Sequence, residues 1–258
     1  MLAYQWQATS GIPVVFLHGL LGSQQDWAEV FALLQKYSHI RPLAIDLPYH
    51  AGSQDIGCTD FADCRQQLHQ TLTTQISQPF FLVGYSLGGR IALDYAFHQP
   101  NPYLKGVILE GANIGLKTEM EKQARWRNDR LWADRFRREP IQNVLTDWYQ
   151  QPVFADLSPN KRFDFIQKRQ NNDGKKIAQM LEVTSLAKQP LFDCTQDPRL
   201  HFLIGEKDLK FREMAESNGL NYQLIHNAGH NAHQHNPHNF VLRLVGLITG
   251  CNIKNEEP

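Results

Sequence analysis

The amino-acid sequence predicts an α/β protein with a mostly parallel central sheet flanked by helices. Three observations lead to this prediction. Short apolar runs recur along the chain, helical patterns lie between several of them, and one long interval has helical patterns without a strand candidate. With 258 residues, the chain is long enough to form one large hydrophobic core.

The strands and helices are expected in alternation. Six apolar runs are typical of buried strands, at residues 13–17, 41–45, 80–83, 106–109, 200–204 and 222–225. Helical patterns cover residues 26–35, 61–76 and 88–98, and either Thr59 or Asp60 could cap the second helix. The alternation implies a doubly wound sheet with right-handed crossovers.

The interval from residue 112 to residue 190 interrupts this alternation. Its helical stretches are long and polar, with eight basic and five acidic residues between positions 115 and 140. An all-helical insertion after a core strand is well placed to cover the carboxyl ends of the strands. We therefore expect residues 1–111 and 191–258 to form the core, and residues 112–190 to form a helical cap subdomain.

Composition excludes several classes of partner. Lys+Arg and Asp+Glu both total 26, and this balance gives no general attraction to nucleic acid or to an acidic membrane. No stretch approaches the roughly 20 apolar residues of a membrane helix, and the first residues do not resemble a signal peptide. We expect a cytoplasmic protein, either a monomer or a weak homo-oligomer, with a polar, frayed tail at 252–258. The cysteines are expected to be reduced: Cys58, Cys64, Cys194 and Cys251.

The stretch Gly84-Tyr85-Ser86-Leu87-Gly88 carries the strongest chemical signal. A Gly-x-Ser-x-Gly pattern occurs by chance in many proteins, but here a predicted strand enters it and a predicted helix leaves it. This is the setting of a nucleophile elbow, in which the turn is strained and its neighbours leave no room for side chains. The alternative is that Ser86 merely caps the helix. The elbow predicts an α/β-hydrolase fold with Ser86 as its reactive residue.

A serine hydroxyl needs an imidazole to accept its proton, and the imidazole needs a carboxylate to orient it. In this fold the chain order is serine, acid, histidine. Asp208 follows the strand at 200–204, and His230 follows the strand at 222–225, so both are expected at the carboxyl edge of the sheet beside Ser86.

Other acids and histidines compete for these roles. Glu206 could replace Asp208, although it lies closer to the strand end. His226 could be an exposed loop residue. His233, His235 and His238 are expected on the solvated side of the last helix. Five histidines lie within thirteen residues, but no metal-ligand spacing is evident, so we expect neither a metal nor a cofactor.

The stretch His18-Gly19-Leu20-Leu21-Gly22 directly follows the first predicted strand. It fits the loop that donates one backbone N–H group to an oxyanion hole, while the residue after the nucleophile donates the other. The expected donors are the amides of Leu20 and Leu87. His18 itself is expected to be a structural hydrogen-bonding residue.

The sequence resembles the 2-succinyl-6-hydroxy-2,4-cyclohexadiene-1-carboxylate synthase family of menaquinone biosynthesis, called MenH, from about residue 16 to residue 237. The matching segments within the predicted cap are the ones specific to this family, since other proteins of this fold do not share them. One departure is the turn Glu110-Gly111-Ala112-Asn113, whose last two residues differ from those of the family. The matching segments are 84–90, 124–125, 129–132, 146–154, 169–172, 180–187, 205–211 and 228–233.

The resemblance implies a lyase that eliminates pyruvate from an enolpyruvyl cyclohexene tricarboxylate. It implies that Ser86, polarised by His230 and Asp208, removes a proton from carbon. Planar guanidinium groups suit three substrate carboxylates. The implied substrate-binding residues are Arg90, Arg125, Arg169, Tyr85 and Trp148, although Trp148 could equally belong to the cap core.

Three other functions stay open on the residues alone. The first is a serine esterase or thioesterase, and the second a carbon–carbon bond hydrolase, both of which would use Ser86 as a covalent nucleophile. The third is a non-catalytic ligand-binding protein. The fold by itself does not decide between a lyase and a hydrolase.

Overall fold

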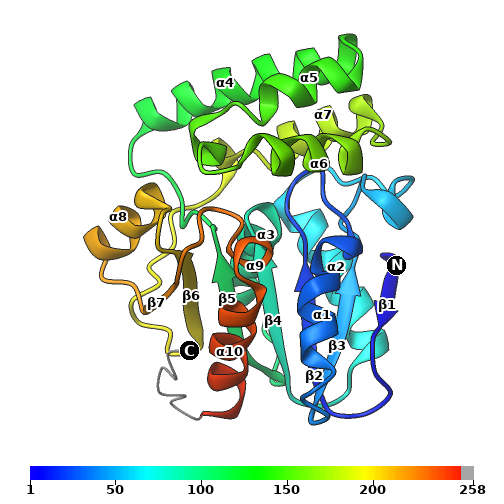
Figure 1. The fold of residues 1–258 in the computed structure, drawn as a ribbon, viewed down its shortest axis with the longest axis vertical. Coiled ribbons are helices and arrows are strands. Elements are labelled where there is room, and N and C mark those ends of the chain that lie inside the picture. Colours follow the sequence, from blue (N-terminus) through cyan, green and yellow to red (C-terminus); the bar gives the residue numbers. More distant parts are fainter. Residues whose placement is uncertain (251–258) are drawn as a thin grey trace.

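Seven strands form one sheet in the computed structural model, which describes residues 1–250 (Figure 1). Across the sheet the order is β1-β3-β2-β4-β5-β6-β7, with β1 antiparallel to β3 and all other neighbours parallel. The expected frayed tail and Cys251 lie outside the described residues. The strand bounds are β1 Tyr4–Trp6, β2 Ile12–Leu17, β3 Ile40–Ile45, β4 Phe80–Tyr85, β5 Leu104–Glu110, β6 Leu200–Gly205 and β7 Tyr222–Ile225.

The six predicted strands are all present, and their ends differ from the prediction by at most two residues. The predicted α/β-hydrolase fold, with its mostly parallel sheet, is confirmed. The sequence pattern did not reveal β1, which has only three residues and pairs with β3 at one edge of the sheet.

Helices cover both faces of the sheet. Successive side chains of a strand point to opposite faces, and in this sheet apolar side chains lie on both of them. On β2, Val14 and Phe16 pack into the cluster under α1 (Ala28–Leu34) and α10 (Pro237–Thr249). Val15 and Leu17 pack on the other face, where α2 (Phe61–Gln75), α3 (Leu87–His98) and α8 (Leu209–Ser217) lie. Asp60 caps α2 by accepting a hydrogen bond from Asp63 N at 2.8 Å.

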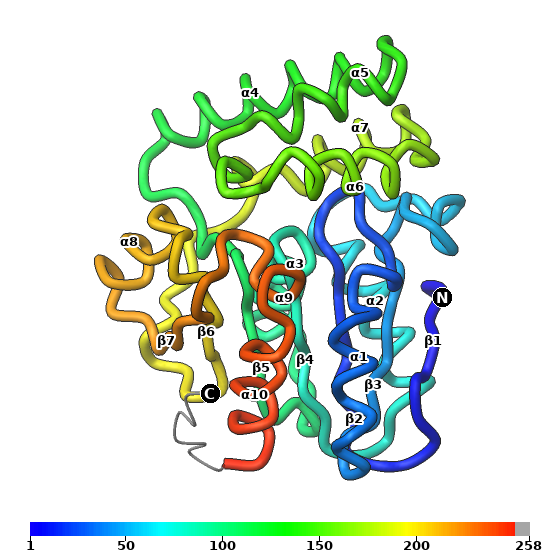
Figure 2. Tube along the Cα trace, in the orientation of Figure 1, coloured from blue at the N-terminus to red at the C-terminus, as the bar shows by residue number. Residues whose placement is uncertain are grey.

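Between β5 and β6 the chain leaves the sheet and forms a layer of helices beyond one end of the strands (Figures 1 and 2). These helices bury an apolar cluster of their own, which includes Phe136 and Ile177 and which Leu21 joins from the loop after β2. The division into a core and a cap subdomain at the stated boundaries stays a prediction. The bounds are α4 Glu119–Arg138, α5 Ile141–Trp148, η3 Pro152–Phe154, α6 Pro159–Arg169, α7 Gly174–Val183 and η4 Leu186–Lys188.

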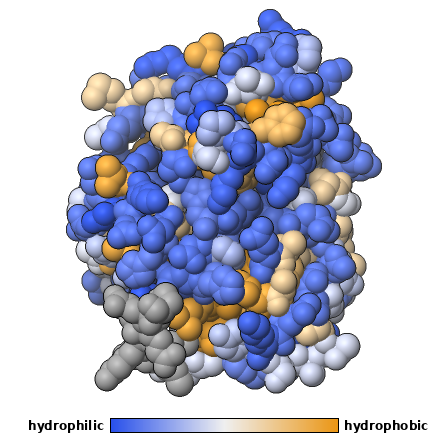
Figure 3. Space-filling model, viewed as in Figure 1, coloured by the Kyte–Doolittle hydropathy of each residue, from blue (hydrophilic) through white to orange (hydrophobic). Residues whose placement is uncertain are grey.

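The surface is mostly hydrophilic on the face shown in Figure 3, where hydrophobic side chains form small separated areas. Within residues 1–250, no helix combines the length and the apolar character that crossing a membrane requires.

Candidate active site

Ser86 lies in the turn between β4 and α3 with φ +49° and ψ −109°, a conformation that L residues rarely adopt. The turn needs glycine beside it, because a Cβ atom on Gly88 would lie 2.4 Å from the carbonyl oxygen of Leu17. The Ser86 N–H donates to the Glu110 carbonyl at 2.8 Å, and the Arg90 N–H donates to the Ser86 carbonyl at 3.0 Å. The strand-turn-helix geometry of a nucleophile elbow is therefore present.

His230 is paired with Asp208 at the same edge of the sheet. The Nδ1 atom of His230 lies 2.8 Å from Oδ2 of Asp208, and both side chains are buried. Asp208 directly precedes α8, and His230 follows β7. The alternative acid, Glu206, instead accepts a hydrogen bond from Asn227 N at 2.9 Å. The structure thus brings Asp208 to the imidazole.

Gly111 and Tyr85 lie between the serine turn and the imidazole of His230 in the network of contacts. A Cβ atom on Gly111 would lie 2.6 Å from Cε1 of His230, and the Tyr85 ring centroid is 5.4 Å from that of His230. Ser86 Oγ makes no hydrogen bond within the described part of the chain, so a Ser86–His230 hydrogen bond is not formed in this structure. Such contacts are often long without substrate and shorten when substrate binds.

Aromatic rings enclose His230. Besides Tyr85, Phe211 lies 5.0 Å and Phe154 lies 6.2 Å from the imidazole, measured between ring centroids. Phe154 belongs to η3 of the helical layer, whereas Phe211 belongs to α8 of the core. These rings displace water, which strengthens electrostatic interactions at the imidazole.

The loop after β2 passes directly beside the serine. A Cβ atom on Gly19 would lie 3.5 Å from the Ser86 Cβ. No hydrogen bond from the amides of Leu20 or Leu87 is formed with any residue from 1 to 250. Both amides are therefore available to a ligand oxygen, as an oxyanion hole requires, but their role stays a prediction.

Two buried histidines hold this loop. His18 Nε2 accepts from Leu47 N at 3.0 Å, and His50 Nε2 accepts from Leu21 N at 3.0 Å. Burial lowers the pKa of His18 to about 4 and the pKa of His50 to about 3. Both rings are therefore neutral acceptors at physiological pH. His18 is a structural hydrogen-bonding residue, as expected from the sequence.

This arrangement predicts a loss of stability in mild acid. The folded-state pKa of each ring lies below its unfolded value of 6.5, so below pH 6.5 the unfolded chain binds protons that the folded chain does not. The contribution of the two rings to the free energy of unfolding is fully present above pH 6.5 and decreases as the pH falls toward the folded-state pKa values. Together, His18 and His50 should lower the free energy of unfolding by roughly 2 to 3 kcal/mol between pH 7 and pH 5.5.

Urea unfolding at the two pH values measures this difference. Replacing His50 by Gln retains a hydrogen-bond acceptor for Leu21 N but removes one titrating group. The variant should show about half of the wild-type difference between pH 7 and pH 5.5. An unchanged difference would contradict the assignment of the pH effect to this loop.

Arg90 and Arg125 converge from α3 and α4 on the residues that follow α7. Arg90 is buried and donates to the Thr184 carbonyl at 2.7 Å. Arg125 Nε lies 2.8 and 2.9 Å from the carboxylate oxygens of Asp129, which also accepts from Ser185 Oγ at 2.7 Å. Burial, together with the neighbouring Arg125, lowers the pKa of Arg90 to about 9. Arg125 is thus paired with Asp129, whereas Arg90 has no carboxylate partner among the described residues, so the two neighbouring cations keep a net positive charge that suits an anion.

Arg169 already has a carboxylate partner that the sequence analysis did not foresee. Its Nη2 atom lies 2.6 Å from Oδ1 of Asp26, and both side chains are buried. Asp26 also completes a capping box with Ser23 at the start of η1 (Gln24–Trp27). Arg169 Nε is buried without a hydrogen-bond partner among the described residues, so one donor stays available.

The two aromatic residues expected in the pocket differ in their surroundings. Tyr85 is buried beside His230 and adjoins Ser86. Trp148 is half-buried and packs against Trp132 and Phe136 at 5.0 and 5.5 Å between ring centroids. These contacts place Trp148 in the aromatic cluster of the helical layer, the alternative that the sequence left open, and its contact with substrate stays a prediction.

The prediction for the histidines after His230 was partly wrong. His238 is exposed, as expected, but His233 is fully buried against Glu110, and His235 is partly buried with Nδ1 3.0 Å from Asp156. The physical reason is that α9 (Ala232–His235) is a separate short turn before α10, so its histidines face the core and the helical layer.

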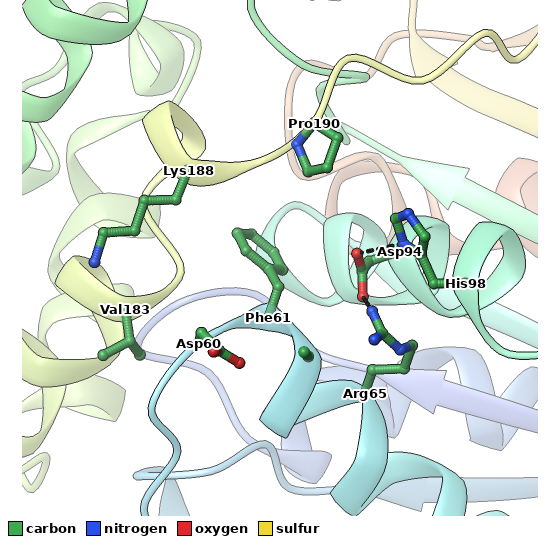
Figure 4. A pocket seen from close by; sticks show the side chains of 9 residues that line it. Asp60, Phe61, Arg65, Asp94, His98, Val183, Lys188 and Pro190 are labelled. Atoms are coloured by element: carbon green, nitrogen blue, oxygen red, sulfur yellow. Dashed lines mark hydrogen bonds and ion pairs between the residues drawn. The ribbon is translucent and has the colours of Figure 1, made fainter.

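A pocket of about 280 Å³ lies between α2, α3 and the segment that follows α7 (Figure 4). Asp94 holds Arg65 at 2.6 Å and His98 at 2.9 Å there. None of the predicted site residues lines this pocket, although Phe61 in its wall also contacts the Arg90 guanidinium. Across positions 1–250, no group of three or more His, Cys, Asp or Glu side chains could hold a metal ion.

The fold and the site together define an α/β-hydrolase protein with a serine elbow and an oriented histidine. A family model described as "Alpha/beta hydrolase family" matches residues 14–243. A solved thermophilic esterase from Thermogutta terrifontis has a TM-score of 0.79 at 20% identity, covering 97% of this chain and 93% of that chain. This likeness shows the fold alone.

Relatives with higher sequence identity show which family of α/β hydrolases the chain belongs to. The 2-succinyl-6-hydroxy-2,4-cyclohexadiene-1-carboxylate synthase of Klebsiella pneumoniae subsp. pneumoniae is 43% identical over 238 residues, covering 91% of this chain and 93% of that protein. The Yersinia pseudotuberculosis protein of the same name is 44% identical over 241 residues, covering 92% and 87%. The solved structure of MenH from S. aureus has a TM-score of 0.85 at 25% identity, covering 97% and 99%. The chain therefore belongs to the 2-succinyl-6-hydroxy-2,4-cyclohexadiene-1-carboxylate synthase family of α/β hydrolases.

Proposed function

We propose that this protein eliminates pyruvate from 2-succinyl-5-enolpyruvyl-6-hydroxy-3-cyclohexene-1-carboxylate to give 2-succinyl-6-hydroxy-2,4-cyclohexadiene-1-carboxylate in menaquinone biosynthesis. The observation that carries the proposal is the combination, at one edge of the sheet, of an Asp208-oriented imidazole and the paired cations Arg90 and Arg125. The names of relatives that match nine tenths of the chain support the same reaction.

The chemistry begins at the ring carbon next to the succinyl ketone. Ser86, polarised by His230, takes the proton from this carbon, and Asp208 orients the imidazole and stabilises its charged form. Negative charge then develops on the ketone oxygen, where the Leu20 and Leu87 amides donate. The electron pair moves through the ring double bond and breaks the carbon–oxygen bond to the enolpyruvyl group, which leaves as pyruvate after protonation.

The substrate carries three carboxylates, and the site supplies buried or half-buried guanidinium groups. Among the described residues, Arg125 is paired with Asp129 and Arg90 has no carboxylate partner, so the two cations keep net positive charge for an anion. Arg169 offers its Nε atom, which has no partner among the described residues, while Asp26 holds the neighbouring Nη2 atom. Charge-assisted hydrogen bonds of this kind are strong where water is excluded.

The proposed reaction transfers no electrons between molecules, so its atom balance requires no redox cofactor. We further propose that residues 112–190 act as a cap over the site and that the protein works in the cytoplasm as a monomer or weak homo-oligomer. The buried free thiols Cys58, Cys64 and Cys194 are compatible with a reducing compartment.

Incubating the protein with the enolpyruvyl tricarboxylate tests the proposal. One pyruvate should appear for each conjugated diene formed, as measured by a coupled pyruvate assay and by ultraviolet absorbance. The intact mass of the enzyme, measured by rapid quench during turnover, should not change. An acyl group on Ser86 under these conditions would instead indicate covalent catalysis.

A further inference from the structure

Glu110 and His233 form a second acid–histidine pair, which the proposed mechanism does not use. Glu110 ends β5, His233 lies in α9, and both side chains are fully buried. The carboxylate oxygens lie 2.9 and 2.8 Å from His233 Nδ1, and Oε1 also accepts from the His233 backbone N–H at 3.0 Å. The Gln234 amide nitrogen lies 3.2 Å from Nε2. With a partner at each nitrogen, the ring is fixed and its proton lies on Nδ1, facing the carboxylate.

Stability alone does not explain an acidic pair at this depth. A buried carboxylate is costly even when it is paired, and apolar residues of similar volume often serve folding equally well. The position of Glu110 offers a different explanation. Its carbonyl oxygen accepts from Ser86 N at 2.8 Å, while its side chain holds His233 in α9, three residues after His230. One residue is thus hydrogen-bonded both to the serine turn and to the short helix that follows His230.

The packing of the rings reinforces this connection. The His233 ring packs against Tyr85, at 4.9 Å, and against Trp27, at 4.3 Å between centroids. Tyr85 in turn lies 5.4 Å from His230. Gly111, next to Glu110, touches the His230 ring so closely that a Cβ atom there would lie 2.6 Å from Cε1. A shift of His233 would therefore displace Tyr85, which is next to Ser86, and Gly111, which contacts His230.

We infer that Glu110 and His233 are positioning residues that set the separation between Ser86 and His230. This inference rests on the proposed function of Ser86 and His230 as the proton-transferring pair. Proton transfer depends steeply on this separation, and a displacement of about 1 Å can cost roughly 100-fold in rate. The pair acts on the serine and the imidazole and does not contact substrate.

Replacing Glu110 by Gln tests the inference. The variant keeps the length of the side chain, but one oxygen becomes an NH₂ group that cannot accept a hydrogen bond from His233. We expect kcat for pyruvate release to fall roughly 10- to 100-fold while KM changes less than about 2-fold. In the substrate-free protein, the proton NMR resonance of the His230 Nδ1–H group bonded to Asp208 should shift or broaden.

Asp94 supplies the matched control, since it is a buried carboxylate on α3 that binds Arg65 and His98 (Figure 4). Asp94→Asn should lower the unfolding temperature and leave both kcat and the His230 resonance unchanged. If Glu110→Gln also leaves kcat and the His230 resonance unchanged, the pair is only structural and the inference is overturned.

If Glu110→Gln does not fold, His233→Gln is judged by the same two measurements. A wild-type protein without pyruvate release would reject the proposed function, whereas the NMR comparison needs no substrate.

Discussion

Replacing Ser86 by Ala is expected to lower kcat for pyruvate release by about 100- to 10,000-fold, the range of a positioned acid–base group. The side chain of Ser86 projects from a strained turn that other residues hold by backbone hydrogen bonds, so removing its oxygen should not disturb the elbow. His230 would remain oriented by Asp208, but no hydroxyl would lie between the imidazole and the substrate carbon. Steady-state kinetics with the enolpyruvyl tricarboxylate measures the effect.

The thermal unfolding temperature and the affinity for substrate serve as controls for Ser86→Ala. Both should stay close to the wild-type values, because Ser86 Oγ makes no hydrogen bond with any residue that the structure describes. A decrease in kcat of less than about 10-fold would show that His230 takes the proton directly, since a working general base contributes more than this.

Replacing Arg125 by Ala is expected to lower kcat/KM for the tricarboxylate by about 100- to 1,000-fold. The guanidinium can offer two charge-assisted hydrogen bonds, and a loss of this size corresponds to roughly 3 to 4 kcal/mol for the two together. Turnover of a small neutral ester, if detectable, should change little. Because the substitution leaves Asp129 with Ser185 Oγ as its remaining side-chain partner, thermal unfolding must be measured alongside the kinetics.

Arg127 provides a control on the same helix. It is exposed and makes no ion pair or hydrogen bond within the described chain, so Arg127→Ala removes a charge from α4 without removing a polar interaction there. We expect its kcat/KM to stay within about 2-fold of wild type, since isolated surface charges contribute little. Equal losses for Arg125→Ala and Arg127→Ala would show that substrate senses only the general charge of the helix.

The sequence was sufficient to predict most of the sheet and the position of the candidate reacting groups at the carboxyl ends of its strands. Buried parallel strands appear as continuous apolar runs, and loops after parallel strands meet at one edge, so Ser86, Asp208 and His230 could be placed together without coordinates. The strand β1 was missed because it has only three residues, none of them buried, and these show no distinctive pattern.

Long-range pairs could not be predicted in the same way. Arg169 and Asp26 are 143 positions apart, and His233 and Glu110 are 123 positions apart. Each of these residues resembles a solvated surface residue in its local sequence, and only the fold reveals its partner. The break between α9 and α10 at Asn236 turns His233 inward, which a single continuous helix would not do.

The fate of the proton next to the ketone tests the central claim most directly. A substrate that carries deuterium on the ring carbon bearing the succinyl group is turned over, and the ring product is analysed by mass spectrometry. Elimination by Ser86 and His230 predicts a ring product that has lost the deuterium, formed together with one pyruvate per ring. A ring product that retains the deuterium would contradict proton abstraction from carbon.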